Sequence, residues 1–147
     1  MIVVKSPTAL MAIFIWIGFV CAISFMEAWL KFTAPGVTLP LGLGIGKIVF
    51  GALNKVEWVL TFVVFINLFI SQKNVFSRKN TAFFIAVAVL LIQTFWLLPL
   101  LNTRAQLYID GITAADSNLH FYYVGVEAVK VISLLVFGIS LLKKKFQ

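Results

Sequence analysis

Residues 119–142 read LHFYYVGVEAVKVISLLVFGISLL, an apolar run that contains His120, Glu127 and Lys130. A helix needs about 20 apolar residues to cross the roughly 30 Å hydrocarbon core of a bilayer, so this run is long enough to span it. Three earlier runs have similar length and character, at residues 8–30, 46–70 and 81–101. The sequence therefore predicts an all-α integral membrane protein, a four-transmembrane-helix bundle forming one domain over residues 1–147.

The composition also favours a lipid bilayer as the main partner of this chain. Of the 147 residues, 62% are hydrophobic and 12% are charged, whereas soluble domains are about 45–50% apolar and about 25% charged. The net charge of +7 does not indicate a nucleic-acid partner, because most charged residues lie at the ends of the apolar runs. Cys21 is the only cysteine and lies within the first run, so no internal disulfide is expected.

The basic residues are distributed unequally between the two sides of the predicted bundle. One side would carry Lys5, Lys73, Arg78, Lys79, Lys143, Lys144 and Lys145, and the other Lys31, Lys47 and Arg104. Cytoplasmic loops are enriched in lysine and arginine. We therefore expect both termini and residues 73–80 on the cytoplasmic side, and residues 102–118 on the outer side.

The fourth run carries a line of polar side chains on one helix face. His120, Tyr123, Glu127 and Lys130 are separated by three or four residues, which places them on the same side of a helix. At about 1.5 Å per residue, Lys130 would lie roughly 15 Å deeper than His120, near the bilayer centre. An ionisable group at that depth costs about 2.5–3.5 kcal/mol or more. We therefore expect Glu127 and Lys130 to face the bundle interior and to be charge-compensated.

Polar residues of the other runs fall in the same outer half of the predicted bundle: Glu27, Asn54, Glu57, Gln93 and Arg104. Together with the four on the last run, they are the candidates for an outward-facing polar pocket that binds a small ligand or an ion. The alternative is that these groups only pair with one another and fix the register of the four helices. Buried opposite charges need partners in either case.

Neither a catalytic residue nor a cofactor is predicted from the sequence. Catalysis would require an activated nucleophile, a metal cluster or a cofactor motif, and none is recognisable. His120 has no second histidine and no usable cysteine to accompany it, so no metal site is predicted. A carboxylate-assisted metal site with Glu27 or Glu57 is the weaker alternative.

Glycines near the start of the second run are interpreted as helix-packing positions and not as a phosphate-binding loop. Gly42, Gly44 and Gly46 precede Lys47, but the leading glycine and the Ser or Thr of a phosphate-binding loop are missing. Small residues instead let membrane helices approach closely. We expect Gly46 or Gly51 to lie at a close helix–helix contact, and Val64 to face outward.

Three segments, GIGKIVFGALNKVEWVL, LNTRAQLYIDG and SNLHFYYVGVEAVK, carry a resemblance to a known group of proteins. They include Arg104, His120, Tyr123, Glu127 and Lys130, and the resemblance extends over about half of the chain. It is to an uncharacterised family of small four-span bacterial membrane proteins, distantly similar to copper-resistance-D-type proteins. This implies a four-helix bundle in the bacterial inner membrane, without an established reaction. The segments FMEAWLKFTAP and VEW also resemble DoxX-type four-span proteins.

Three functions are open at this point. The first is binding or transport of a small ligand or ion by the outward pocket, with a homo-oligomer as a possible assembly. The second is an accessory or structural subunit of a larger membrane complex, in which the buried charges serve helix packing. The third, ranked last, is a membrane enzyme acting on a lipid or a quinone.

Overall fold

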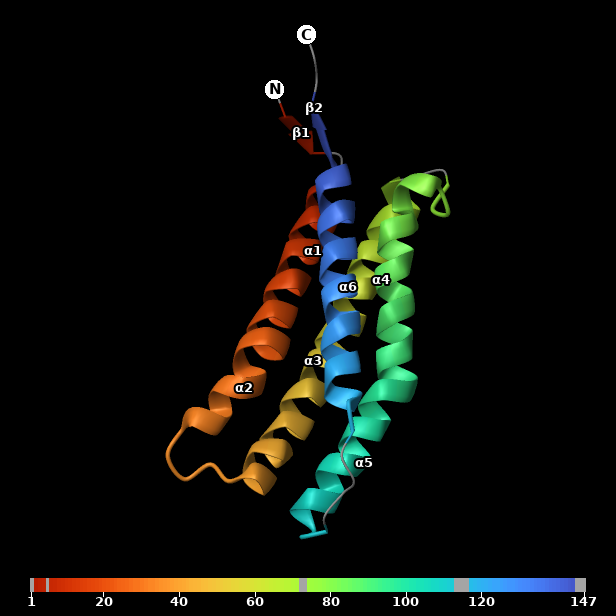
Figure 1. The fold of residues 1–147 in the computed structure, drawn as a ribbon. Coiled ribbons are helices and arrows are strands. Elements are labelled where there is room, and N and C mark those ends of the chain that lie inside the picture. Colours follow the sequence, from red (N-terminus) through yellow and green to blue (C-terminus); the bar gives the residue numbers. More distant parts are fainter. Residues whose placement is uncertain (1, 5, 72–73, 113–116, 145–147) are drawn as a thin grey trace.

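The structure is a computed structural model that describes residues 2–4, 6–71, 74–112 and 117–144. Its elements follow one another as β1 (Ile2–Val4), α1 (Pro7–Val20), η1 (Cys21–Glu27), α2 (Ala28–Leu30), η2 (Lys31–Thr33), α3 (Leu39–Ser71), η3 (Arg78–Asn80), α4 (Thr81–Ile92), η4 (Gln93–Leu97), α5 (Leu98–Ile109), α6 (Leu119–Ser140) and β2 (Leu142–Lys144). Consecutive helical elements join into four long rods (Figure 1).

The described residues contain four helical segments long and apolar enough to cross a membrane: Pro7–Thr33, Leu39–Ser71, Arg78–Ile109 and Leu119–Ser140. The predicted four-helix arrangement is thereby confirmed, and the chain is consistent with an integral membrane protein. The second segment begins before residue 46 because Pro40 fits the first turn of a helix, where its missing N–H is not needed. The third segment continues past residue 101 as α5. Its last turns are polar and still helical, so the helix extends beyond the apolar run.

The interior of the bundle is mainly apolar over the half nearest the chain termini. α6 packs against α4 and α1, and α3 packs against α1 and α5. Ile13, Leu68, Phe83 and Phe137 are all fully buried there, and the rings of Phe83 and Phe137 lie 5.4 Å apart. Many other large apolar side chains point outward, as expected for a protein whose outer surface meets lipid.

Both ends of the chain lie at the same end of the bundle (Figure 1). β1 pairs with β2 in antiparallel register, with Ile2 opposite Lys144. This short pairing was not predicted from the sequence. An even number of crossings requires the two termini to share one side, so this arrangement agrees with the predicted topology without fixing which side is cytoplasmic.

The glycine expectations are only partly correct. A Cβ added to Gly46 would lie 3.0 Å from Lys31 Nζ, whereas nothing lies within 4 Å of one added to Gly51, so Gly51 was the wrong choice. Close contacts also lie at Gly42, where an added Cβ would overlap the Phe32 ring, and at Gly138, where it would lie 3.3 Å from Ile13. Val64 is fully buried, because it follows Thr61 and Glu57 on the inner face of α3, so its predicted outward orientation was wrong.

Candidate functional site

Lys130 lies at the centre of a buried cluster of polar side chains near the middle of the bundle. Its ammonium group forms ion pairs with Glu57 and with Glu127, the latter at 3.0 Å. It also donates a hydrogen bond to Gln93 Oε1 at 2.6 Å. Lys130 and Glu127 are 0% exposed, and Glu57 and Gln93 are 1% exposed. The expectation that Glu127 and Lys130 face the interior and are compensated is therefore confirmed.

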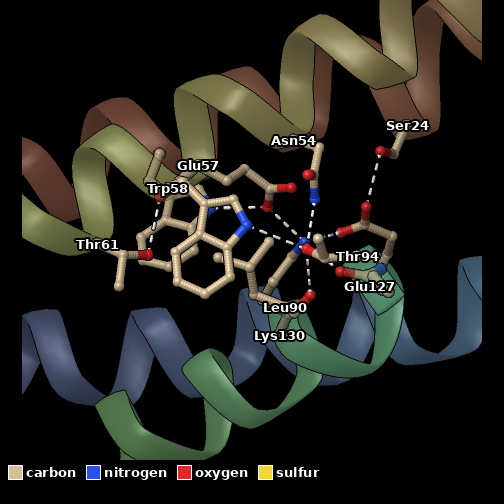
Figure 2. Close-up of polar contacts among 11 residues, drawn as sticks. Ser24, Asn54, Glu57, Trp58, Thr61, Leu90, Thr94, Glu127 and Lys130 are labelled. Carbon is tan, nitrogen blue, oxygen red and sulfur yellow. Dashed lines mark hydrogen bonds and ion pairs between the residues drawn. The ribbon is translucent and has the colours of Figure 1, made fainter. Parts of the chain in front are cut away.

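The first transmembrane segment completes this cluster from the other side. Trp16 Nε1 donates a hydrogen bond to Glu57 Oε1 at 2.8 Å, and Ser24 Oγ donates to Glu127 Oε1 at 3.1 Å. Figure 2 shows the Ser24 and Glu127 side chains pointing toward each other across the bundle. All four membrane-spanning segments thus contribute to what we call the charge cluster: Trp16, Ser24, Glu57, Gln93, Glu127 and Lys130.

Two of these side chains come from π-helical turns. Ser24 lies in η1, and Gln93 begins η4. π-Helical turns inside α-helices are rare and are often found at functional sites. In the second case Pro99 follows closely, and its missing N–H cannot support a regular helical hydrogen bond four residues back. The widened turns bring a polar group from each helix to the same interior position.

A second polar contact lies beside the charge cluster, between α3 and η4. Asn54 Nδ2 and Trp58 Nε1 both donate to Thr94 Oγ1, at 2.8 and 3.1 Å, and Thr94 in turn donates to the Leu90 carbonyl at 2.8 Å (Figure 2). Asn54 is therefore engaged in joining two helices and does not contact Lys130. Asn54 was a candidate for the polar pocket, but its described side-chain hydrogen bond is to Thr94.

A pocket of about 110 Å³ lies at the end of the bundle opposite the termini. Its wall is formed by α2 and η2, the start of α3, α5 and the start of α6. Most of the lining is apolar, including Leu43, Phe50, Leu98 and Leu101. The pocket is thus apolar rather than polar, in contrast to the predicted chemistry.

Three basic side chains line the same pocket: Lys31, Lys47 and His120. Lys31 pairs with Glu27 at 3.2 Å, so its charge is largely compensated. The exposed Lys47 donates to the neutral amide oxygen of Gln106 at 3.1 Å, which satisfies a hydrogen bond without cancelling the charge. The pocket therefore combines apolar walls with a basic rim.

Tyr123 connects the pocket with the charge cluster. It lines the pocket and is 3% exposed, and its ring meets Phe50 edge-on with the centroids 5.4 Å apart. Tyr123 also lies one helical turn from Glu127 and within interaction range of its carboxylate. The two sites are separate spaces that share this one side chain.

The nine sequence candidates therefore divide among several places. Glu57, Gln93, Glu127 and Lys130 form the charge cluster, while His120 and Tyr123 line the pocket. Asn54 joins helices, Glu27 pairs with Lys31, and Arg104 is half-buried on α5. The nine residues do not line a single pocket. The expectation treated residues at equal depth along the four helices as neighbours, but side chains at equal depth can point in different directions.

Sequence reasoning missed Trp16 and Thr94 as polar partners. Trp16 lies on the buried stripe that continues through Val20 to Ser24, at intervals of four residues. An indole N–H on the same face as a buried serine was a usable signal, because buried tryptophans normally find a hydrogen-bond acceptor. Thr94 had no such signal, since threonine is common in membrane helices and bonds to its own backbone.

Comparison with known proteins adds no further identification: no protein family, curated protein or solved structure matches the chain. Within the described residues, no group of three or more His, Cys, Asp or Glu side chains is arranged to hold a metal ion.

Proposed function

We propose that the protein is a small membrane protein of the bacterial inner membrane that binds a small amphipathic anion in the pocket at the outer end of its bundle. The observation that carries this proposal is the pocket's chemistry, with apolar walls and a basic rim. A short hydrocarbon chain fits the walls, and an acidic head group fits Lys47, because ionic hydrogen bonds are about twice as strong as neutral ones.

The proposed orientation places the termini in the cytoplasm and the pocket outside. The lysine and arginine asymmetry of the connecting segments supports it. Binding is favoured over transport, because the core between the charge cluster and the terminal end is filled by apolar side chains such as Leu68, Phe83 and Phe137. A ligand entering from the outer end would meet Tyr123 and stop there.

One experiment tests both the orientation and the ligand class. Asn102, a half-buried residue of the pocket wall, is replaced by cysteine in a Cys21→Ser background. We expect an impermeant thiol reagent to label it from outside intact cells, and hexanoate to protect it better than hexanol, which has the same chain without the charge. Lys47→Gln should weaken the protection by hexanoate about tenfold, which corresponds to about 1.4 kcal/mol.

The controls separate the two claims. A cysteine at the exposed Asn74, near the other end of the bundle, should stay unlabelled from outside. Labelling of position 74 in place of position 102 would reverse the orientation. If position 102 is labelled from outside but hexanoate and hexanol protect it equally, the proposal of an anionic ligand is contradicted and the orientation is supported.

A second candidate function, an accessory subunit of a larger membrane complex, is favoured by Lys55. This lysine is exposed on α3, although it lies only two residues, about 3 Å of helix, from the fully buried Glu57. Glu57 pairs with Lys130, midway along α6, so Lys55 faces outward near the middle of the span. A lysine facing lipid at that depth is costly, and a carboxylate in a partner helix would compensate it.

Purification in mild detergent tests this second candidate. We expect a foreign membrane subunit to copurify at a fixed ratio with the natural chain and to be lost from Lys55→Met. Val59→Ala, one turn further along the same exposed face of α3, is the matched control and should retain the partner. Recovery of the chain alone, or only as a homo-oligomer, would argue against the accessory-subunit function.

A further inference from the structure

The charge cluster contains one more carboxylate than cation. Glu57 and Glu127 both contact Lys130, and the charged groups that act on Glu57 are Lys130 and Glu127. With all three ionised, the cluster would carry a net charge of −1 in a region where each of these three side chains is at most 1% exposed. An uncompensated charge buried at membrane depth is strongly disfavoured.

Among the residues that the structure describes, the other elements packed around the cluster supply no second positive charge. α1 and η1 contribute Trp16 and Ser24, and η4 contributes Gln93, all of which are neutral. Lys55 on α3 is exposed on the outer face. Arg104 follows Gln93 by eleven residues (93 to 104), about 16 Å of helix, which puts it beyond reach of the cluster.

We propose that the charge cluster is a proton-binding site, in which Glu127 holds a proton while Glu57 and Lys130 form the ion pair. The geometry distinguishes the two carboxyls. Glu57 pairs with Lys130 and accepts a hydrogen bond from the Trp16 indole, which can only donate, so Glu57 has the stronger support for a negative charge. Glu127 faces Ser24, whose hydroxyl can accept a hydrogen bond as readily as donate one.

Tyr123 gives this proton a route to the pocket. Its side chain lies beside Glu127 and also lines the pocket, so Tyr123 is the one described polar residue that borders both spaces. On the other side of the cluster the core is mainly apolar, and its nearest buried polar side chains, Thr61 and Ser133, donate to the backbone of their own helices. The proton site rests on the charge count of the cluster and does not depend on the ligand proposed for the pocket.

Infrared spectroscopy of the purified full-length protein at pH 7 tests the proposal, because a protonated carboxyl has a carbonyl stretch distinct from that of a carboxylate. We expect a signal from one protonated carboxyl per chain. Glu127→Gln and Glu57→Gln should each abolish it, because either change leaves one carboxylate paired with Lys130. Lys130→Met should raise it to two per chain. Glu27→Gln, which alters the carboxylate paired with Lys31, is the matched control and should leave it unchanged.

Three further results decide the details. Glu127→Asp should shift the carbonyl frequency while Glu57→Asp leaves it in place, and the reverse would overturn the assignment to Glu127.

Tyr123→Phe, which keeps the ring against Phe50, should slow deuterium exchange of the signal at least several-fold, and unchanged exchange would overturn the route. Absence of the signal from the natural protein, or its survival in both glutamine variants, would overturn the proton site itself.

Discussion

Replacing Lys130 with methionine should lower the free energy of unfolding by about 3–5 kcal/mol. Methionine has a similar volume, so the change removes a charge without creating a large cavity. It leaves Glu57 and Glu127 side by side in the interior without a cation, so that both carboxyls must take up a proton to stay buried, and it removes the donor to Gln93. The effect is measured by unfolding the protein with sodium dodecyl sulfate in mixed micelles and following its circular dichroism.

Two companion variants show whether charge is the cause of this loss. Lys55→Met removes an exposed lysine from α3 and should leave the free energy of unfolding unchanged or raise it, because a lysine facing lipid near the middle of the span is costly. The triple change Lys130→Met, Glu57→Gln and Glu127→Gln removes every formal charge from the cluster and should recover part of the stability. Similar losses for Lys130→Met and Lys55→Met would contradict a central role for the cluster in holding the bundle together.

Trp16→Phe should lower the free energy of unfolding by about 1–3 kcal/mol. The fully buried Trp16 indole donates 2.8 Å to Glu57 Oε1, and a phenyl ring cannot replace that bond or fill the same volume. The loss should exceed that of an ordinary packing change, because Glu57 is left with less support for its negative charge. The same unfolding measurement applies.

Trp29→Phe is the matched control for this second prediction. Trp29 also donates a hydrogen bond, to the Phe25 carbonyl at 2.9 Å, but its side chain is 60% exposed. Its replacement should change the free energy of unfolding by no more than about 0.5 kcal/mol. Equal losses at positions 16 and 29 would mean that the contact with Glu57 contributes nothing beyond burial of an aromatic ring.

The pocket and the charge cluster suggest different contributions to function. The pocket lies at the end of the bundle and has the chemistry to select a ligand. The charge cluster is buried inside the bundle and is proposed to hold a proton. Since Tyr123 borders both, a ligand that moves its hydroxyl would change the surroundings of Glu127. Binding at the pocket and protonation at the cluster are therefore expected to influence each other, and by linkage the influence must be reciprocal.

The sequence by itself determined the number of helices, their approximate positions and the burial of Glu127 and Lys130. Each of these follows from local physics: the length of an apolar run is set by bilayer thickness, and a charge at mid-span must face protein. The same physics identified Glu57 and Gln93 as partners at the right depth. It also placed His120 and Tyr123 near the start of the fourth helix, at the end of the bundle opposite the termini.

Only the tertiary structure decided which of these polar groups meet. The depth of a residue follows from its position along a helix, but its direction depends on how that helix is rotated and on turns such as η1 and η4, which a regular helical period does not predict. For this reason Ser24 and Trp16 bond to the glutamates of the cluster. Asn54 instead bonds to Thr94, and Glu27 pairs with Lys31. The pocket likewise depends on how four helix ends are spaced, a property of their packing that no single segment of the sequence contains.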